Sequence, residues 1–227
     1  MIMRSVNIKR RILVINPNSN PAVSEGIRLA GATVTMADTE LVVVNPSRGP
    51  LSIESPEQRE QAIAPLLDLA QRYRGDDFDA YVLACYDDIA LTDLRHLLGK
   101  PVVGAFEASI AAARSVTSRF CIVTTVDSAL PTINGLLREY GAQDSGQVMA
   151  AGIGVAEAAG GGASAEIKLI KTIAAAIEQG AEAIVLGSGG LIGRAPALAN
   201  VFNTPVIDSV LSAITIAEGL ARLRIRD

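Results

Sequence analysis

Residues 79–85 read DAYVLAC and residues 182–188 read EAIVLGS, and the two stretches share one pattern. Each has a short, unbroken apolar run that leads into Cys85 or Ser188. Such a run is typical of a strand in a parallel sheet with helices on both faces. Each stretch precedes a helical pattern and then a Pro-Val strand, KPVV at residues 100–103 and TPVI at residues 204–207. The repetition predicts two similar halves.

The rest of the chain alternates in the same way between β-branched runs and helical patterns. Further strands are expected at residues 11–15, 40–44, 120–123 and 147–153. Helices are expected at residues 21–30, 57–74, 92–98, 107–117, 129–140, 163–179, 195–202 and 209–222. The glycines at 160–162 lack the Lys-Ser/Thr of a phosphate-binding loop, and we interpret them as a flexible connection. The fold class that follows is α/β.

We predict two pseudo-symmetric lobes, each a largely parallel sheet flanked by helices. The first lobe would comprise residues 1–105 with 208–227, and the second would comprise residues 106–207. Ligands of open α/β sheets bind beyond the carboxyl ends of the strands. Two facing lobes would therefore form one cleft around Asn16, Cys85, Thr124, Thr125 and Ser188.

The composition excludes several classes of function. The chain has 227 residues, of which 49% are hydrophobic and 19% charged, so a sizeable core is expected rather than disorder. A net charge of −4 and 4% aromatic residues argue against nucleic-acid binding. No apolar run is long enough for a signal peptide or a membrane span. We expect a cytoplasmic enzyme, and the apolar-rich composition favours a homo-oligomer.

The sequence offers few residues for a metal site or a disulfide framework. The chain has one histidine, His96, and two cysteines, Cys85 and Cys121, with no C-x-x-C pair. A zinc site needs about four close ligands, so no metal is expected. Two cysteines are too few for a disulfide framework, which fits a reduced compartment.

Cys85 has two interpretations of equal weight when only its position is considered. It comes directly after a predicted strand and before a helix, where backbone N–H groups would favour a reactive thiolate. It also suits a small, buried hydrophobic residue. Cys121 lies inside a predicted strand, which favours a place in the core.

A family resemblance adds to this pattern. The motifs that carry it are RILVINPNS at residues 11–19, NPSRGPLSIE at 45–54, ACYDD at 84–88, PVVGAFEA at 101–108, VTT at 123–125 and EAIVLGSGG at 182–190. In this order and spacing they resemble the hydantoin racemase branch of the aspartate/glutamate racemase superfamily, over about residues 11 to 220. The resemblance implies two α/β lobes with the active site between them. It also implies a racemase that needs no metal or organic cofactor.

The resemblance further implies two cysteines on opposite sides of the substrate's acidic carbon. One takes a proton as the thiolate and the other gives one as the thiol. Cys85 matches the first cysteine, and Ser188 stands in the place of the second. The implied substrate is a small cyclic ureide or an amino-acid derivative. The residues expected to bind it are Asn16, Pro50, Ser52, Tyr86, Asp87, Thr124, Thr125, Gly189 and Gly190.

Ser188 is a departure from the two-thiol pattern. A serine hydroxyl cannot rest as an anion at neutral pH without an adjacent base. His96 is not expected to be that base, because its helix should run away from the cleft. Three accounts stay open: an engineered replacement in a racemase, a hydrolase with Cys85 as the nucleophile, and a lone thiol acting in a decarboxylase, lyase or cis–trans isomerase. A non-catalytic binding protein is a rival of another class.

Charged neighbours of the motifs also have two interpretations each. Asp87 and Asp88 would orient a ligand N–H, or they would cap the next helix, and a nearby carboxylate would raise the pKa of the thiol. Arg48 and Arg194 are candidate carboxylate clamps, since a guanidinium binds a carboxylate through two hydrogen bonds, or they are ordinary exposed arginines.

Overall fold

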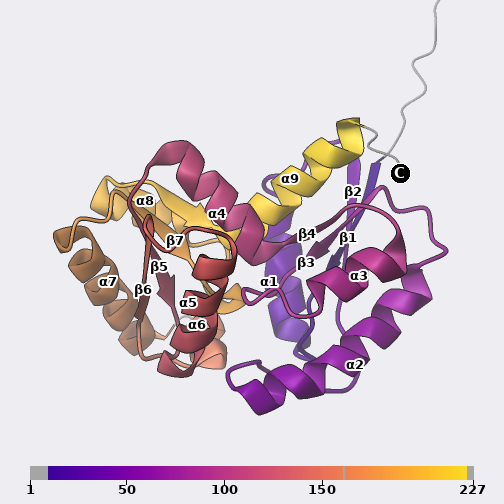
Figure 1. The fold of residues 1–227 in the computed structure, drawn as a ribbon, viewed down its shortest axis with the longest axis horizontal. Coiled ribbons are helices and arrows are strands. Elements are labelled where there is room, and N and C mark those ends of the chain that lie inside the picture. Colours follow the sequence, from indigo (N-terminus) through magenta and orange to yellow (C-terminus); the bar gives the residue numbers. More distant parts are fainter. Residues whose placement is uncertain (1–9, 161, 224–227) are drawn as a thin grey trace, which may run out of the picture.

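The computed structural model describes residues 10–160 and 162–223, and they form two α/β lobes that lie side by side (Figure 1). The first sheet has the strand order β2-β1-β3-β4, and the second has β6-β5-β7-β8. Every neighbouring pair of strands is parallel. The predicted fold class is therefore confirmed, and the two lobes share one topology.

The strands fall close to the predicted ranges. They are β1 (Arg10–Ile15), β2 (Thr39–Val44), β3 (Ala80–Leu83), β4 (Val102–Gly104), β5 (Phe120–Thr124), β6 (Gly146–Ala150), β7 (Ala183–Leu186) and β8 (Val206–Asp208). Strand β1 shows why unbroken apolar runs are needed, since its residues 12–15 are all fully buried. Ile12 and Val14 pack on one face of the sheet, and Leu13 and Ile15 pack on the other.

The helices also match the expected pattern, with three short additions. They are α1 (Pro21–Gly31), α2 (Pro56–Tyr73), α3 (Leu91–Leu98), α4 (Ala105–Val116), α5 (Leu130–Glu139), α6 (Val155–Gly160), α7 (Ala163–Glu178), α8 (Ala195–Phe202) and α9 (Ser209–Leu223). Helix α6 and the 3-10 turns η1 (Asp127–Ala129) and η2 (Gly189–Leu191) are short. Helix α6 was not expected, because six residues give too little periodicity to reveal a helix. Gly160 ends α6, Gly162 precedes α7, and Gly161 lies outside the described residues.

Two helices join the lobes. In Figure 1, α4 and α9 lie next to each other above the gap between the sheets. Ala105 and Ala108 of α4 pack into the core of the first lobe, whereas Phe106 and Ile110 pack into that of the second. Helix α9 follows β8 of the second sheet and packs its buried face on the first. The predicted boundary between residues 105 and 106 thus falls in the first turn of α4.

Helix starts near the cleft are capped by residues that the sequence supplies locally. Asn20 caps α1 by accepting a hydrogen bond from the backbone N–H of Ala22, 3.0 Å away. Ser55 caps α2 by accepting one from Gln58, at 3.3 Å. Within the described ranges, none of the helices is long and apolar enough to cross a bilayer.

Candidate active site

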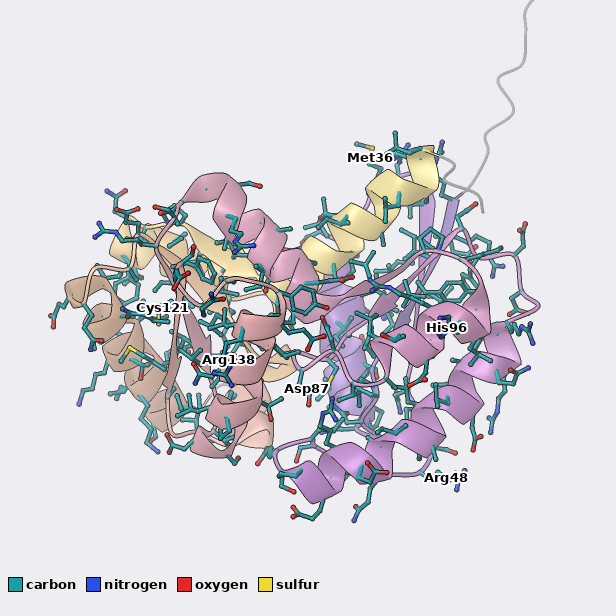
Figure 2. All side chains as sticks on the ribbon, viewed as in Figure 1. Met36, Arg48, Asp87, His96, Cys121 and Arg138 are labelled. Atoms are coloured by element: carbon teal, nitrogen blue, oxygen red, sulfur yellow. The ribbon has the colours of Figure 1, made fainter. Side chains whose placement is uncertain are left out.

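A cavity of about 370 Å³ lies between the lobes, at the carboxyl ends of the strands. The first lobe lines it with the turn after β1, the loop before α2 and the turn after β3. The second lobe lines it with the turns after β5 and β7 and with the start of α5. In Figure 2, Asp87 lies in the middle of the molecule, where the halves meet. This is the edge at which parallel sheets bind ligands.

Cys85 and Ser188 occupy equivalent places in the two lobes. Cys85 comes two residues after the end of β3, and Ser188 comes two residues after the end of β7. Strands β3 and β7 hold the same position in their sheets, and both residues line the cavity. The shared topology therefore brings the two predicted catalytic side chains to one space from opposite lobes.

The thiol of Cys85 is held by a carboxylate of its own turn. Cys85 Sγ donates a hydrogen bond to Asp87 Oδ1, with 2.9 Å between the atoms. The other carboxylate oxygen, Oδ2, accepts from Arg59 Nε of α2 at 3.1 Å. Burial and then the negative charge of Asp87 raise the pKa of the Cys85 thiol well above its usual value. Cys85 is thus protonated at neutral pH in this state.

The backbone N–H of Asp87 does favour the thiolate, as expected, but burial and the Asp87 carboxylate outweigh it. Helix α3 begins only at Leu91, so Cys85 does not lie at a helix N-terminus. The carboxylate of Asp87 raises the pKa of the thiol more than the backbone N–H lowers it.

Asp88 caps a helix, although not the next one along the chain. Its backbone is left-handed, with φ of 45°, which turns the side chain toward α4. Its two carboxylate oxygens accept from the backbone N–H groups of Phe106 and Glu107, each at 3.1 Å. Burial raises the pKa of Asp88 to about 7, although these two hydrogen bonds act in the opposite direction. Asp88 therefore connects the Cys85 turn to α4, one of the two helices that join the lobes.

Ser188 is buried and caps the short turn η2. Its Oγ accepts a hydrogen bond from the backbone N–H of Gly190 at 3.3 Å. Accepting this bond leaves the hydroxyl hydrogen to serve as a donor. Gly187 precedes it, and a Cβ there would lie 2.7 Å from Ile122 Cγ2 and 2.9 Å from Tyr86 Cε1. Only glycine lets this turn approach the other lobe so closely.

Asparagine and threonine side chains line the cavity beside these two groups. Asn18 lines the wall, and its Oδ1 accepts from Asn16 Nδ2 and from the backbone N–H of Asn20, each at 3.0 Å. Its amide NH₂ is therefore the group that it can offer to a ligand. Asn16 is fully buried behind Asn18 and does not line the cavity. Thr124 and Thr125 line the second lobe's side, where Thr124 Oγ1 donates to the carbonyl of Gly187 at 3.1 Å.

Other expected binding residues lie at different distances from the cavity. Gly189 and Tyr86 line it, but the Tyr86 ring packs edge-on against Phe106, with centroids 5.3 Å apart. Pro50, Ser52 and Gly190 are outside the lining. Sequence reasoning overlooked several lining residues, namely Asn18, Ile53, Glu54, Ser55, Arg59 and Ser128. Asn18 and Glu54 belong to the motifs at 11–19 and 45–54, whereas Arg59 lies in an ordinary helical pattern.

The remaining candidates lie away from the site. His96 is exposed on α3, and Cys121 is buried in β5, as expected; Figure 2 shows both far from Asp87. Arg48 pairs with Asp68 on the surface, at 2.5 Å. Arg194 pairs with Glu166, and neither arginine lines the cavity. Among the described residues, no three His, Cys, Asp or Glu side chains gather as metal ligands would.

Comparison with known proteins identifies the family of this chain. A family model described as Asp/Glu/hydantoin racemase matches residues 12–217. The chain belongs to the Asp/Glu/hydantoin racemase family. It is 36% identical to a hydantoin racemase of Paenarthrobacter aurescens over 217 residues, which cover 94% of this chain and 92% of the relative.

Solved structures agree with the family. An allantoin racemase from Klebsiella pneumoniae is similar with a TM-score of 0.92 and 34% identity, over 96% of this chain and 90% of that one. An allantoin racemase from Pseudomonas fluorescens gives a TM-score of 0.89 and 32% identity, over 95% and 92%. The expected resemblance is confirmed, and this family member is an isomerase of the racemase type.

Proposed function

We propose that this enzyme moves a proton at the acidic carbon of a small, neutral cyclic ureide, with Cys85 as the acid and base on one face. The observation that carries the proposal is the position of the Cys85 thiol, which lines the cavity opposite the equivalent turn of the other lobe. The relatives named hydantoin and allantoin racemases support the same substrate class. Cys85 and Ser188 would face the two sides of the ring carbon.

The charges around the cavity favour a neutral ligand. Among the described residues that line it, Arg59 is the one basic side chain, and Asp87 already engages it. Glu54 and Asp87 supply two acidic groups. A free dicarboxylic amino acid would meet acidic residues with no basic partner to spare, and like charges repel. The ring of a cyclic ureide is uncharged, and its carbonyls can accept hydrogen bonds from the amide NH₂ of Asn18.

Ser188 makes the two sides of the site unequal. A carbon acid next to a carbonyl needs a positioned base and a donor for the enolate oxygen. Cys85 can give and take a proton, whereas a neutral serine hydroxyl donates a hydrogen bond and is a much weaker acid than a thiol. We infer that exchange with solvent on the Cys85 side is faster than inversion, which needs a proton from the Ser188 side.

The relatives named hydantoin and allantoin racemases favour proton transfer over the hydrolase alternative. Both reactions need the Cys85 thiolate, so the product of the reaction, and not the pKa of the thiol, separates them. The decarboxylase alternative needs an anionic substrate, for which the cavity has no spare basic group. Free thiols at Cys85 and Cys121 support the reducing cytoplasm as the place of action.

The test follows single enantiomers of hydantoins and of allantoin in D₂O. Mass spectrometry measures deuterium uptake, and chiral chromatography measures inversion. We expect uptake to exceed inversion, Cys85→Ala to slow both by about 10²- to 10⁴-fold, and Ser188→Cys to raise inversion relative to uptake. A substrate mass increased by one water would replace the proposal with the hydrolase. No uptake from any of these ureides would reject the substrate class.

A further inference from the structure

We propose that Asp87 is the proton acceptor of the Cys85 thiol, a positioning residue through which Cys85 becomes able to take the substrate's proton. This inference rests on the proposed function and deepens it, because a neutral thiol is not a base. Before Cys85 can remove a proton from carbon, its own proton must move to another group. The cavity offers an acceptor in direct contact with the sulfur.

The geometry holds the carboxylate in place from two sides. Asp87 Oδ1 lies 2.9 Å from Cys85 Sγ, and Asp87 Oδ2 lies 3.1 Å from Arg59 Nε. Arg59 comes from α2, which precedes the Cys85 turn by a whole strand, so this contact is tertiary. With one oxygen bound to the guanidinium, the other stays turned toward the thiol. The Asp87 side chain is only 19% exposed, so solvent competes weakly for it.

Other titratable groups near the thiol are committed elsewhere or make no contact with it. Asp88 adds negative charge to the same turn, but both of its oxygens accept backbone N–H groups of α4. Glu54 lines the cavity from the loop before α2, and Arg59 reaches it from α2 itself. His96 is exposed on the outer side of α3 (Figure 2). Asp87 is the carboxylate in hydrogen-bond contact with Sγ.

The proton balance of the step is simple. The S–H bond of Cys85 breaks, and an O–H bond forms on Asp87 Oδ1. The thiolate then takes the proton of the acidic carbon, and the electron pair of that C–H bond moves into the neighbouring carbonyl. Asp87 passes its proton to water in the cavity, and the Cys85 thiol, which now holds the substrate's proton, exchanges it with water through the same carboxylate. The thiol then returns a solvent proton to the carbon, and water reprotonates the thiolate, so that Cys85 and Asp87 end as they began. No oxidant, metal or further reactant is needed.

The experiment compares Asp87→Asn, Asp87→Glu and a control, Asp68→Asn, whose acid pairs with Arg48 on the surface. The first readout needs no substrate: the rate of iodoacetamide alkylation at Cys85 against pH, located by peptide mass spectrometry. We expect the midpoint to fall by about one pH unit or more in Asp87→Asn, which is about tenfold more thiolate at neutral pH. The control should keep the wild-type midpoint.

The second readout is deuterium exchange into the ureide. We expect Asp87→Asn to slow it about tenfold or more at unchanged KM, because the amide cannot carry a proton between sulfur and water even though the thiol ionises more readily. Asp87→Glu should restore part of the rate. An unchanged alkylation midpoint, or full exchange in Asp87→Asn, would overturn the role of Asp87. If the wild-type enzyme exchanges none of the ureides, the proposed function fails, while the alkylation midpoints still decide whether Asp87 is coupled to Cys85.

Discussion

The turn after β3 and the turn after β7 hold the same place in sheets of the same strand order, yet they present opposite chemistry. The first sets a thiol against the carboxylate of Asp87, with a second buried carboxylate, Asp88, directly behind. The second has no charged residue from Gly187 to Leu191, and its hydroxyl is bound to its own backbone. The scaffold thus places the reacting groups, and the two or three residues after each strand decide which of them can carry a proton.

The largest expected difference between the two turns is in catalysis. Cys85→Ala should slow deuterium exchange by about 10²- to 10⁴-fold, the usual contribution of a positioned acid or base. Ser188→Ala should cost about tenfold or less, because it removes a single neutral hydrogen bond. Exchange rates at saturating ureide measure both. Equal losses would mean that the two turns share the chemistry.

The second expected difference is in the pH dependence of stability. The pKa of Asp88 is raised to about 7 in the folded protein, whereas an unfolded aspartate titrates near pH 4. Between these values the folded state binds more protons, so the free energy of unfolding should fall as pH rises from about 4 to about 7. The effect of this group is on the order of a few kcal/mol.

Urea unfolding of wild type and Asp88→Asn across that range measures the difference in slope. The free energy of unfolding of Asp88→Asn should not show this part of the decrease with pH. Parallel curves for the two proteins would show that Asp88 is ionised throughout and that the Cys85 turn is no more sensitive to pH than the Ser188 turn.

The third difference concerns how closely the turns approach each other. Gly187→Ala would place a Cβ 2.9 Å from Tyr86 Cε1, in the turn after β3, and 2.7 Å from Ile122 Cγ2 of its own lobe, so we expect destabilisation by about 1–3 kcal/mol and a displaced Ser188. Gly135→Ala is the matched control, since a Cβ there meets nothing within 4 Å and α5 should gain slightly. Thermal melting compares them. If Gly187→Ala melted at the wild-type temperature, the turn would accommodate the added Cβ without loss of stability.

The smallest effect is expected where the lobes touch across the cavity. Ser128 Oγ of η1 donates to the carbonyl of Glu54, at 2.5 Å, and both residues line the cavity. Ser128→Ala removes a hydrogen bond worth about 0.5–1.5 kcal/mol, so we expect KM to rise about two- to tenfold with kcat nearly unchanged. A fall in kcat at constant KM would instead place Ser128 in the chemical step.

The pairing of Cys85 with Ser188 was predictable because it depends on local patterns that repeat. Other parts of the site were not. Asn16 was expected to bind substrate, but Asn18, two residues later, lines the cavity, and only the folded turn shows which of the two faces inward. Arg59 carries no motif, because a polar residue on an amphipathic helix usually faces solvent. Helix α6 was too short for its periodicity to be seen.

The sequence by itself determined the two parallel sheets, because unbroken apolar runs are stable only where helices cover both faces. It also determined the helix caps at Asn20 and Ser55, which act within a few residues. The tertiary structure alone decided the protonation of Cys85 and the task of Asp88. Burial by the folded chain is the largest cause of the raised pKa of Cys85, beside the local charge of Asp87, and Asp88 caps α4 through N–H groups such as that of Phe106, 18 residues away. Burial and contacts between distant segments arise only on folding, and no local pattern records them.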